Sequence, residues 1–389
     1  MKRFAYAGVV FLVTIAAIVS RGPDRLFRAQ FWADDASFYS LAYQYGARTL
    51  VQPYSGYLNT LQRLVALSAQ VLPLARAPLL FSVVGILIET LPVPFLLSER
   101  CRNLGGFGAR AALALAYVAL PGTLSLDANV AFGQWHLAVL AFLIVMALPP
   151  PGRAWKAFDV TALIATALSS VFGVLLLPFA LLRRRYFWLL SCTAIVQAVA
   201  VLTSGQLSKR HPPLHASLRL LSEILANHIF VGSLLGPTPW FFSAASYAVC
   251  GAGFALVAYA ALKGVSELRL FLSFAALTLA VSLASPGSID TDWPRFATQA
   301  VGGRYWFIPG LAFVVTLMSL LFRGRRPVRV AAGSLLAVGV LALPWTWRYP
   351  PLPDHHFPEL ARRYDKLPRG AEAVFPICPE PAVLRLTKR

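Results

Sequence analysis

Long apolar stretches alternate with short polar segments along most of the chain, and each stretch is roughly 17–25 residues long, the length of a helix that crosses about 30 Å of hydrocarbon. A β-barrel would instead show short segments of alternating polarity. We therefore expect an all-α polytopic membrane protein. The pattern predicts nine ordinary spans, at residues 4–20, 79–97, 111–126, 132–148, 186–203, 240–262, 269–285, 305–322 and 328–346.

The apolar run at residues 158–182 differs from the others because basic residues flank both of its ends. Lys and Arg accumulate in loops on the cytoplasmic side, so a single crossing here would break that rule. We expect a bent helical hairpin that turns near residues 169–173 and returns to the same side. Irregular backbone at this depth must be buried in protein or line a wet cavity.

Basic residues also predict the orientation of the chain, since most basic clusters lie in short loops that should be cytoplasmic. No small-x-small cleavage motif follows the first span, so we interpret it as a retained signal anchor with a cytoplasmic N-terminus. Residues 21–77 then form a large external loop of a membrane bundle at 1–347, and residues 348–389 form a small external tail. The cytoplasmic clusters are Lys2/Arg3, Arg100/Arg102/Arg110, Arg153/Lys156, Arg183/Arg184/Arg185, Lys263/Arg269 and Arg323/Arg325/Arg326/Arg329.

The composition and charge of the chain argue against several classes of function. The chain is 58% hydrophobic and 13% charged, with a mean hydropathy of +0.64, which is too apolar for a soluble protein. Its net charge of +19 lies between the spans, so we expect no nucleic-acid partner. The sequence contains no P-loop, zinc-ligand spacing or dinucleotide fingerprint. The four cysteines are far apart, and we expect them to be unpaired thiols.

The first external loop holds the residues best suited to chemistry. Asp34 and Asp35 are adjacent carboxylates among aromatic residues, and Trp32 precedes them. A carboxylate there can act as a general base, bind a metal ion or accept hydrogen bonds from sugar hydroxyls. The alternative is that the aspartates cap an interfacial helix and the aromatic residues form the usual interfacial belt.

This loop resembles that of bacterial membrane proteins with the glycosyltransferase C-type (GT-C) architecture. The similarity rests on the motif W-x-D-D at residues 32–35, on PYSGYLNTLQRL at 53–64, and on the turn with Asn129 that leads into Gln134-Trp135-His136. The resemblance implies a GT-C-like bundle, a polyprenyl-phosphate-linked sugar donor and an external glycan or lipid acceptor. It also implies that Asp34 or Asp35 is the catalytic base.

A basic group should stabilise the departing phosphate in such a reaction. Arg304 is favoured, because arginine binds phosphate bidentately and this one lies where an external loop enters a span. Arg63 and the cluster at residues 209–211 are further candidates, and a snorkelling cation is the plain alternative for each. The residues expected to bind substrate are Trp32, Tyr54, Tyr57, Arg63, His136, Arg304 and Tyr305.

Two further residues have open interpretations. His136 is either a substrate contact or, more commonly for a lone histidine, a helix–helix hydrogen-bonding group. Glu89 lies within the second span, where an unpaired carboxylate is costly, so it is a site candidate with an unnamed partner. A divalent metal ion is left open as a cofactor.

The main alternative function is a transporter or lipid flippase, with the run 158–182 as a broken-helix substrate site. Carriers commonly contain inverted repeats, and the two halves of this chain show no self-similarity. A scaffold for other envelope proteins is a third possibility. For the transferase, we expect a multi-pass protein of the cell inner (plasma) membrane in contact with membrane lipids, with its active face periplasmic or extracellular.

Overall fold

The computed structural model describes residues 2–204, 213–236, 241–286, 292–299 and 302–389. These residues are mostly helical, and six helices are long and apolar enough to cross a membrane. The expectation of a mostly helical chain with membrane-length helices is confirmed. The six are Leu74–Leu97, Leu218–Leu235, Ala244–Lys263, Ser266–Ala284, Gly303–Arg323 and Arg326–Thr346.

The first half of the chain contains the helices that surround the 120–132 loop, the irregular segment between α7 and α8. A break at residues 170–171 separates α9 from α10, within the run predicted to bend. The elements are α1 (Lys2–Arg21), α2 (Asp24–Phe27), α3 (Asp34–Tyr45), η1 (Gly46–Val51), α4 (Thr60–Ala69), η2 (Leu74–Arg76), α5 (Ala77–Thr90), α6 (Pro92–Leu97), η3 (Glu99–Leu104), α7 (Phe107–Ala119), α8 (Gly133–Met146), α9 (Arg153–Ser169), α10 (Phe172–Leu182) and α11 (Phe187–Thr203).

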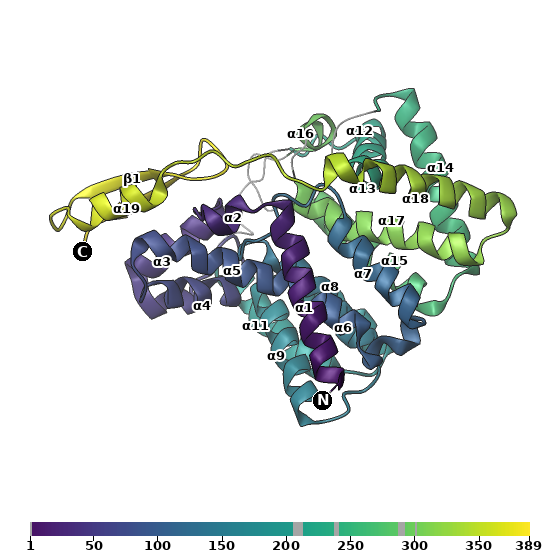
Figure 1. Cartoon of the computed structure of the whole chain (residues 1–389), viewed down its shortest axis with the longest axis horizontal. Coiled ribbons are helices and arrows are strands. Elements are labelled where there is room, and N and C mark those ends of the chain that lie inside the picture. The colour runs from purple at the N-terminus through teal and green to yellow at the C-terminus, as the bar shows by residue number, and fades with distance from the viewer. Residues whose placement is uncertain (1, 205–212, 237–240, 287–291, 300–301) are drawn as a thin grey trace.

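The second half contributes four long helices and four shorter helical segments. The ends of α1, α17 and α18 meet in one region, from which the helices fan out (Figure 1). There the Trp347 indole donates to the Ser20 hydroxyl over 3.0 Å. The elements are α12 (Leu218–Ile224), η5 (Leu225–Phe230), α13 (Gly232–Leu235), α14 (Ala244–Lys263), α15 (Ser266–Ala284), α16 (Trp293–Thr298), α17 (Gly303–Arg323) and α18 (Arg326–Thr346).

Residues 218–235 differ from expectation, because they lie in none of the predicted spans and the structure has an apolar helix there. Polar residues interrupt the apolar pattern of this segment, and two of them bond to the backbone of Phe241 and Ser243. The Glu223 carboxylate accepts from the Ser243 amide over 3.1 Å, and Asn227 donates to the Phe241 carbonyl over 2.8 Å. A hydropathy pattern does not show such partners, so it did not predict this helix.

The 120–132 loop lies directly against α5. A Cβ atom added at Gly85 would come within 2.5 Å of the Asn129 amide nitrogen and 2.6 Å of the Ala128 carbonyl carbon. Only glycine permits such an approach between two backbones. Gly85 therefore fixes how closely the loop sits on the helix that carries Glu89.

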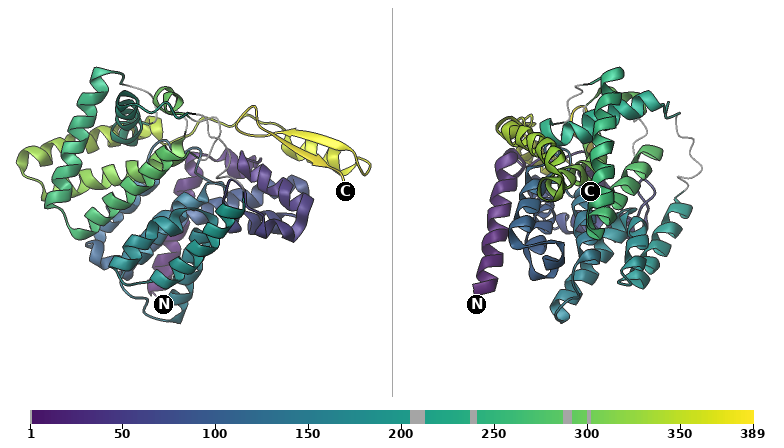
Figure 2. Two further views of the ribbon diagram at one scale, coloured as in Figure 1. Left: turned by 180° about the vertical axis from the view of Figure 1, so that it is seen from behind. Right: turned by 90° about the vertical axis from the view of Figure 1, so that its right-hand side faces the viewer.

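The C-terminal tail folds over the first loop. It contains α19 (Phe357–Asp365) and an antiparallel hairpin of β1 (Glu372–Pro376) and β2 (Val383–Thr387). The Ala33 amide donates to the Cys378 carbonyl over 2.6 Å, and the rings of Phe31 and Phe357 are 5.4 Å apart. The tail points away from α14–α18 and lies beside α3 (Figures 1 and 2).

Candidate functional site

Asp35 joins the first loop to the 120–132 loop. It lies in the first turn of α3 with 2% of its surface exposed, and its carboxylate accepts from the amides of Ala131 (2.8 Å) and Val130 (3.4 Å). Burial raises the pKa of Asp35 to about 8, although the two amide hydrogen bonds act in the opposite direction. Asp35 thus has the contacts of a positioning group.

Asp34 has a different environment from its neighbour. It is half-buried, and its Oδ1 accepts from the Tyr54 hydroxyl over 3.0 Å. Burial, and then the charge of Asp34, raise the pKa of Tyr54 to about 12, so the phenol stays protonated and donates. The Asn59 side chain secures the turn by donating to the carbonyls of Tyr54 (2.8 Å) and Tyr57 (3.0 Å). Asp34 is therefore oriented but still accessible.

Trp32 is half-buried beside the pair. The guanidinium of Arg25 lies 4.4 Å from the centre of its ring, a cation–π arrangement. Arg25 also donates to the Asp127 carbonyl over 2.8 Å. Trp32 is thus connected to the 120–132 loop through an arginine that the sequence analysis did not single out.

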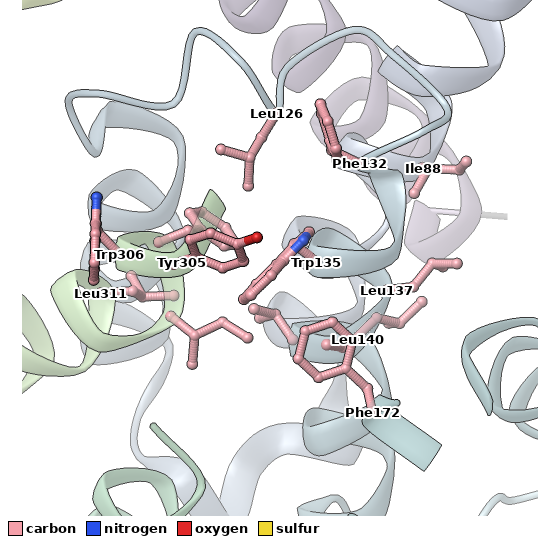
Figure 3. Packing of buried hydrophobic residues seen from close by; sticks show 14 of the residues in the cluster. Ile88, Leu126, Phe132, Trp135, Leu137, Leu140, Phe172, Tyr305, Trp306 and Leu311 are labelled. Carbon is pink, nitrogen blue, oxygen red and sulfur yellow. The ribbon is translucent and has the colours of Figure 1, made fainter. Parts of the chain in front are cut away.

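Arg304 reaches the same loop from α17. Its guanidinium lies 4.7 Å from the centre of the Phe132 ring and donates to the Tyr305 hydroxyl over 2.9 Å. Tyr305 is buried, its ring 5.8 Å from that of Trp135 (Figure 3). Burial, and then Tyr305, raise the pKa of Tyr57. The structure therefore brings Arg304, Tyr305 and Tyr57 together near the loop that Asp35 holds.

Arg63 lies in α4, within the first loop, and is 1% exposed. Its Nε donates to the Leu58 carbonyl over 3.0 Å, and its guanidinium is 5.8 Å from the centre of the Phe38 ring. Its Nη1 has no hydrogen-bond partner among the described residues. The cluster at residues 209–211 falls outside the described residues.

His136 belongs to a second group of buried polar residues behind the 120–132 loop. Its Nδ1 is 2.7 Å from the Tyr117 hydroxyl, and its Nε2 is 3.8 Å from Asp127 Oδ1. Glu89 finds a partner in this loop, since its Oε2 accepts from the Ala128 amide over 3.1 Å. Glu89, Asp127 and His136 each offer a metal-ligand atom, all within 4.8 Å of one another.

The other side of Asp127 is occupied by donors. Its Oδ2 accepts from the Thr123 hydroxyl over 2.9 Å and from the Tyr349 hydroxyl, and lies 3.5 Å from Arg21 Nη1. Arg21 also donates to the carbonyls of Val118 and Leu120 over 2.7 and 2.8 Å. Arg21 is the last residue of α1 and directly follows the first predicted span, so in the sequence it resembles an ordinary interfacial cation.

The geometry therefore provides two neighbouring sites: the carboxylate pair with Arg304, and the buried group around Asp127. Comparisons with protein-family models, curated proteins and solved structures gave no match for this chain.

Proposed function

We propose that the chain is a GT-C-like membrane glycosyltransferase that moves a sugar from a polyprenyl-phosphate donor to an external glycan or lipid acceptor. One observation supports this most directly: the carboxylate pair contacts the 120–132 loop through Asp35, and a guanidinium packs on the same loop. Asp35, next to Asp34, binds the amides of residues 130 and 131, and Arg304 packs on residue 132. The same loop thus positions both the proposed base and the proposed phosphate-binding group.

In the proposed reaction Asp34 accepts the proton of the acceptor hydroxyl as its oxygen bonds to the anomeric carbon of the sugar. The bond from that carbon to the phosphate oxygen breaks, and the phosphate leaves with the electron pair. Arg304 stabilises the resulting charge with its N–H donors. Tyr54 orients the base, Asp35 positions it, and Trp32 and Tyr57 offer aromatic surface to a sugar ring.

The proposal includes the finer topology expected from the sequence. The chain has nine ordinary spans and a bent hairpin over α9 and α10, with a cytoplasmic N-terminus in the inner membrane. In this topology the helix at residues 218–235 does not cross the membrane. The first loop and the C-terminal tail then lie on the periplasmic face. The hydrogen bond between Ala33 and Cys378 supports this arrangement, because it requires both segments to be on the same side.

The test compares Asp34→Asn with a matched carboxylate variant of the same loop, Asp24→Asn. Asp24 lies in α2 and is 4.0 Å from Arg28 on the protein surface. In a strain lacking the native chain, we expect Asp34→Asn to lower sugar transfer by about 10²–10⁴-fold at normal membrane levels, and Asp24→Asn to change little. Arg304→Gln should also slow transfer, with accumulation of the lipid-linked donor.

Unchanged surface glycan with Asp34→Asn at normal protein levels would contradict the proposal. Transfer by the purified chain, with a polyprenyl-phosphate sugar and an acceptor, separates the alternatives. A flippase would show no transfer in detergent and would leave lipid-linked intermediates in the cytoplasmic leaflet of the deletion strain.

A further inference from the structure

We propose that Glu89, Asp127 and His136 bind a divalent transition-metal ion behind the 120–132 loop. The site is separate from the Asp34–Asp35 pair and does not depend on the proposed transferase activity. Its three side chains are each 2–3% exposed and come from α5, the loop and α8. One imidazole and two carboxylates form a ligand set that suits zinc and its first-row neighbours.

The separations between the three ligand atoms are small enough for one metal ion to bind all three. Ligands about 2.1 Å from a metal ion are roughly 3.0–3.4 Å apart in tetrahedral or octahedral geometry. Asp127 Oδ1 and His136 Nε2 are 3.8 Å apart, and the three ligand atoms lie within 4.8 Å of one another. An ion would therefore need to shorten these separations by at most about 1.8 Å, from 4.8 Å to 3.0 Å, which side-chain rotation can provide.

The hydrogen bonds around His136 leave a lone pair of its Nε2 atom facing Asp127. The Tyr117 hydroxyl donates to the Glu89 carbonyl over 2.9 Å. A hydroxyl has one proton, so in the tautomer that satisfies both contacts Nδ1 of His136 donates to the Tyr117 oxygen over 2.7 Å. In the neutral imidazole Nε2 is then an acceptor that faces a carboxylate oxygen. Two acceptors in that arrangement repel each other unless a proton or a metal ion lies between them.

The open atoms of the group point at the same space. Nε2 of His136 and Oδ1 of Asp127 are buried and have no hydrogen-bond partner among the described residues. In contrast, Asp127 Oδ2 accepts from Thr123 and Tyr349. Donors that hold one carboxylate oxygen, and a hydroxyl that fixes the imidazole tautomer, are the usual second shell of a metal site.

Arg21 sets the choice of metal. Its Nη1 is 3.5 Å from the Asp127 oxygen that faces away from His136, so it leaves the ligand atom open but adds positive charge nearby. Arg25 contributes a second cation, bonded to the Asp127 and Leu124 carbonyls. The site should therefore require an ion with high intrinsic affinity for nitrogen and oxygen ligands. Zn²⁺ should bind more tightly than Mn²⁺, and Ca²⁺ should not compete.

The experiment uses the full chain, purified in detergent, stripped with a chelator and equilibrated with Zn²⁺, Mn²⁺ or Ca²⁺. We expect about one zinc ion per chain, measured by plasma mass spectrometry, and at least tenfold weaker binding in His136→Gln and Asp127→Asn. The matched controls are His228→Gln and Glu223→Gln. They alter a buried imidazole bonded to the Phe296 carbonyl and a buried carboxylate bonded to the Ser243 amide.

Equal zinc content in His136→Gln and the wild type would overturn the proposal, as would equal losses in the control variants. X-ray absorption at the zinc edge of the wild-type protein gives a readout that does not depend on how the variants fold. The expected coordination shell contains nitrogen and oxygen with one imidazole. A sulfur-containing shell, or the absence of bound zinc, would refute the site.

Discussion

Two buried arginine–carboxylate pairs lie at opposite ends of α8, and they are built differently. At the C-terminal end of α8, Arg100 binds Asp159 through two hydrogen bonds of 2.5 and 2.7 Å, and Tyr186 donates to the same carboxylate. At the N-terminal end of α8, Arg21 comes only within 3.5 Å of Asp127, and it approaches one oxygen of that carboxylate. The first pair uses both oxygens of its carboxylate, and the second leaves one oxygen open.

This difference separates a structural contact from a candidate site. A buried ion pair with complete hydrogen bonding holds helices together and has no capacity for a ligand. Arg100 also donates to the Leu148 carbonyl over 3.3 Å and lies 5.1 Å from the Trp155 ring centre, so its guanidinium is enclosed. The Asp127 group combines strong positioning with an unused acceptor, an arrangement expected where something else binds.

The largest effect should come from the closed pair. Asp159→Leu leaves the Arg100 guanidinium buried without a counter-charge, so we expect the free energy of unfolding to fall by about 3–5 kcal/mol. The double variant Arg100→Met/Asp159→Leu removes both charges and should recover most of this loss. Denaturant titration in mixed micelles measures both. Additive losses in the double variant would show that the two residues are not coupled.

Much of the fold followed from the apolar pattern, because the length and hydropathy of a membrane helix are local properties of sequence. The helical class and the membrane-length helices could be predicted in this way. The helix at 218–235 could not, because Glu223 and Asn227 lower its hydropathy, and their bonds to Ser243 and Phe241 are made only when the chain folds back.

The candidate site shows the same limit. The motif at residues 32–35 identified a carboxylate pair, but no sequence signal distinguishes the half-buried Asp34 from Asp35, which meets the amides of the 120–132 loop. Glu89 is visible in the sequence as an isolated polar residue in apolar surroundings, but Asp127 is not singled out there. Their convergence with His136 depends on how α5 packs against the loop, which is a tertiary property.

A smaller effect on stability should appear at Asp35, a third buried carboxylate. Its hydrogen-bond donors are two neutral backbone amides and not an arginine. Its pKa is raised from 3.8 to about 8 on folding, so the folded chain holds a proton that the unfolded chain releases between these values. Stability from this group is therefore full at low pH and is lost as the pH rises towards 8. The slope is at most about 1.4 kcal/mol per pH unit.

Asp35→Asn should remove this part of the pH dependence, because asparagine stays neutral and its side-chain oxygen can accept from the same amides. Unfolding measured from pH 5 to 8 in the wild type and the variant gives the comparison, with Asp24→Asn as the control. Parallel stability curves for Asp35→Asn and the wild type would show that Asp35 stays ionised. The amides of residues 130 and 131 would then suffice to hold a charge.

The smallest effect should come from Asp127→Asn in metal-free protein, and it tests the opening contrast most directly. The asparagine oxygen can keep the hydrogen bonds from Thr123 and Tyr349, and its amide can donate towards the free Nε2 of His136. Arg21 retains its bonds to the carbonyls of Val118 and Leu120. We therefore expect a loss of about 1 kcal/mol, the size of an ordinary hydrogen bond. A loss as large as that of Asp159→Leu, in the same micelle titration, would mean that Asp127 is as fully engaged as Asp159 and that its second oxygen is not open.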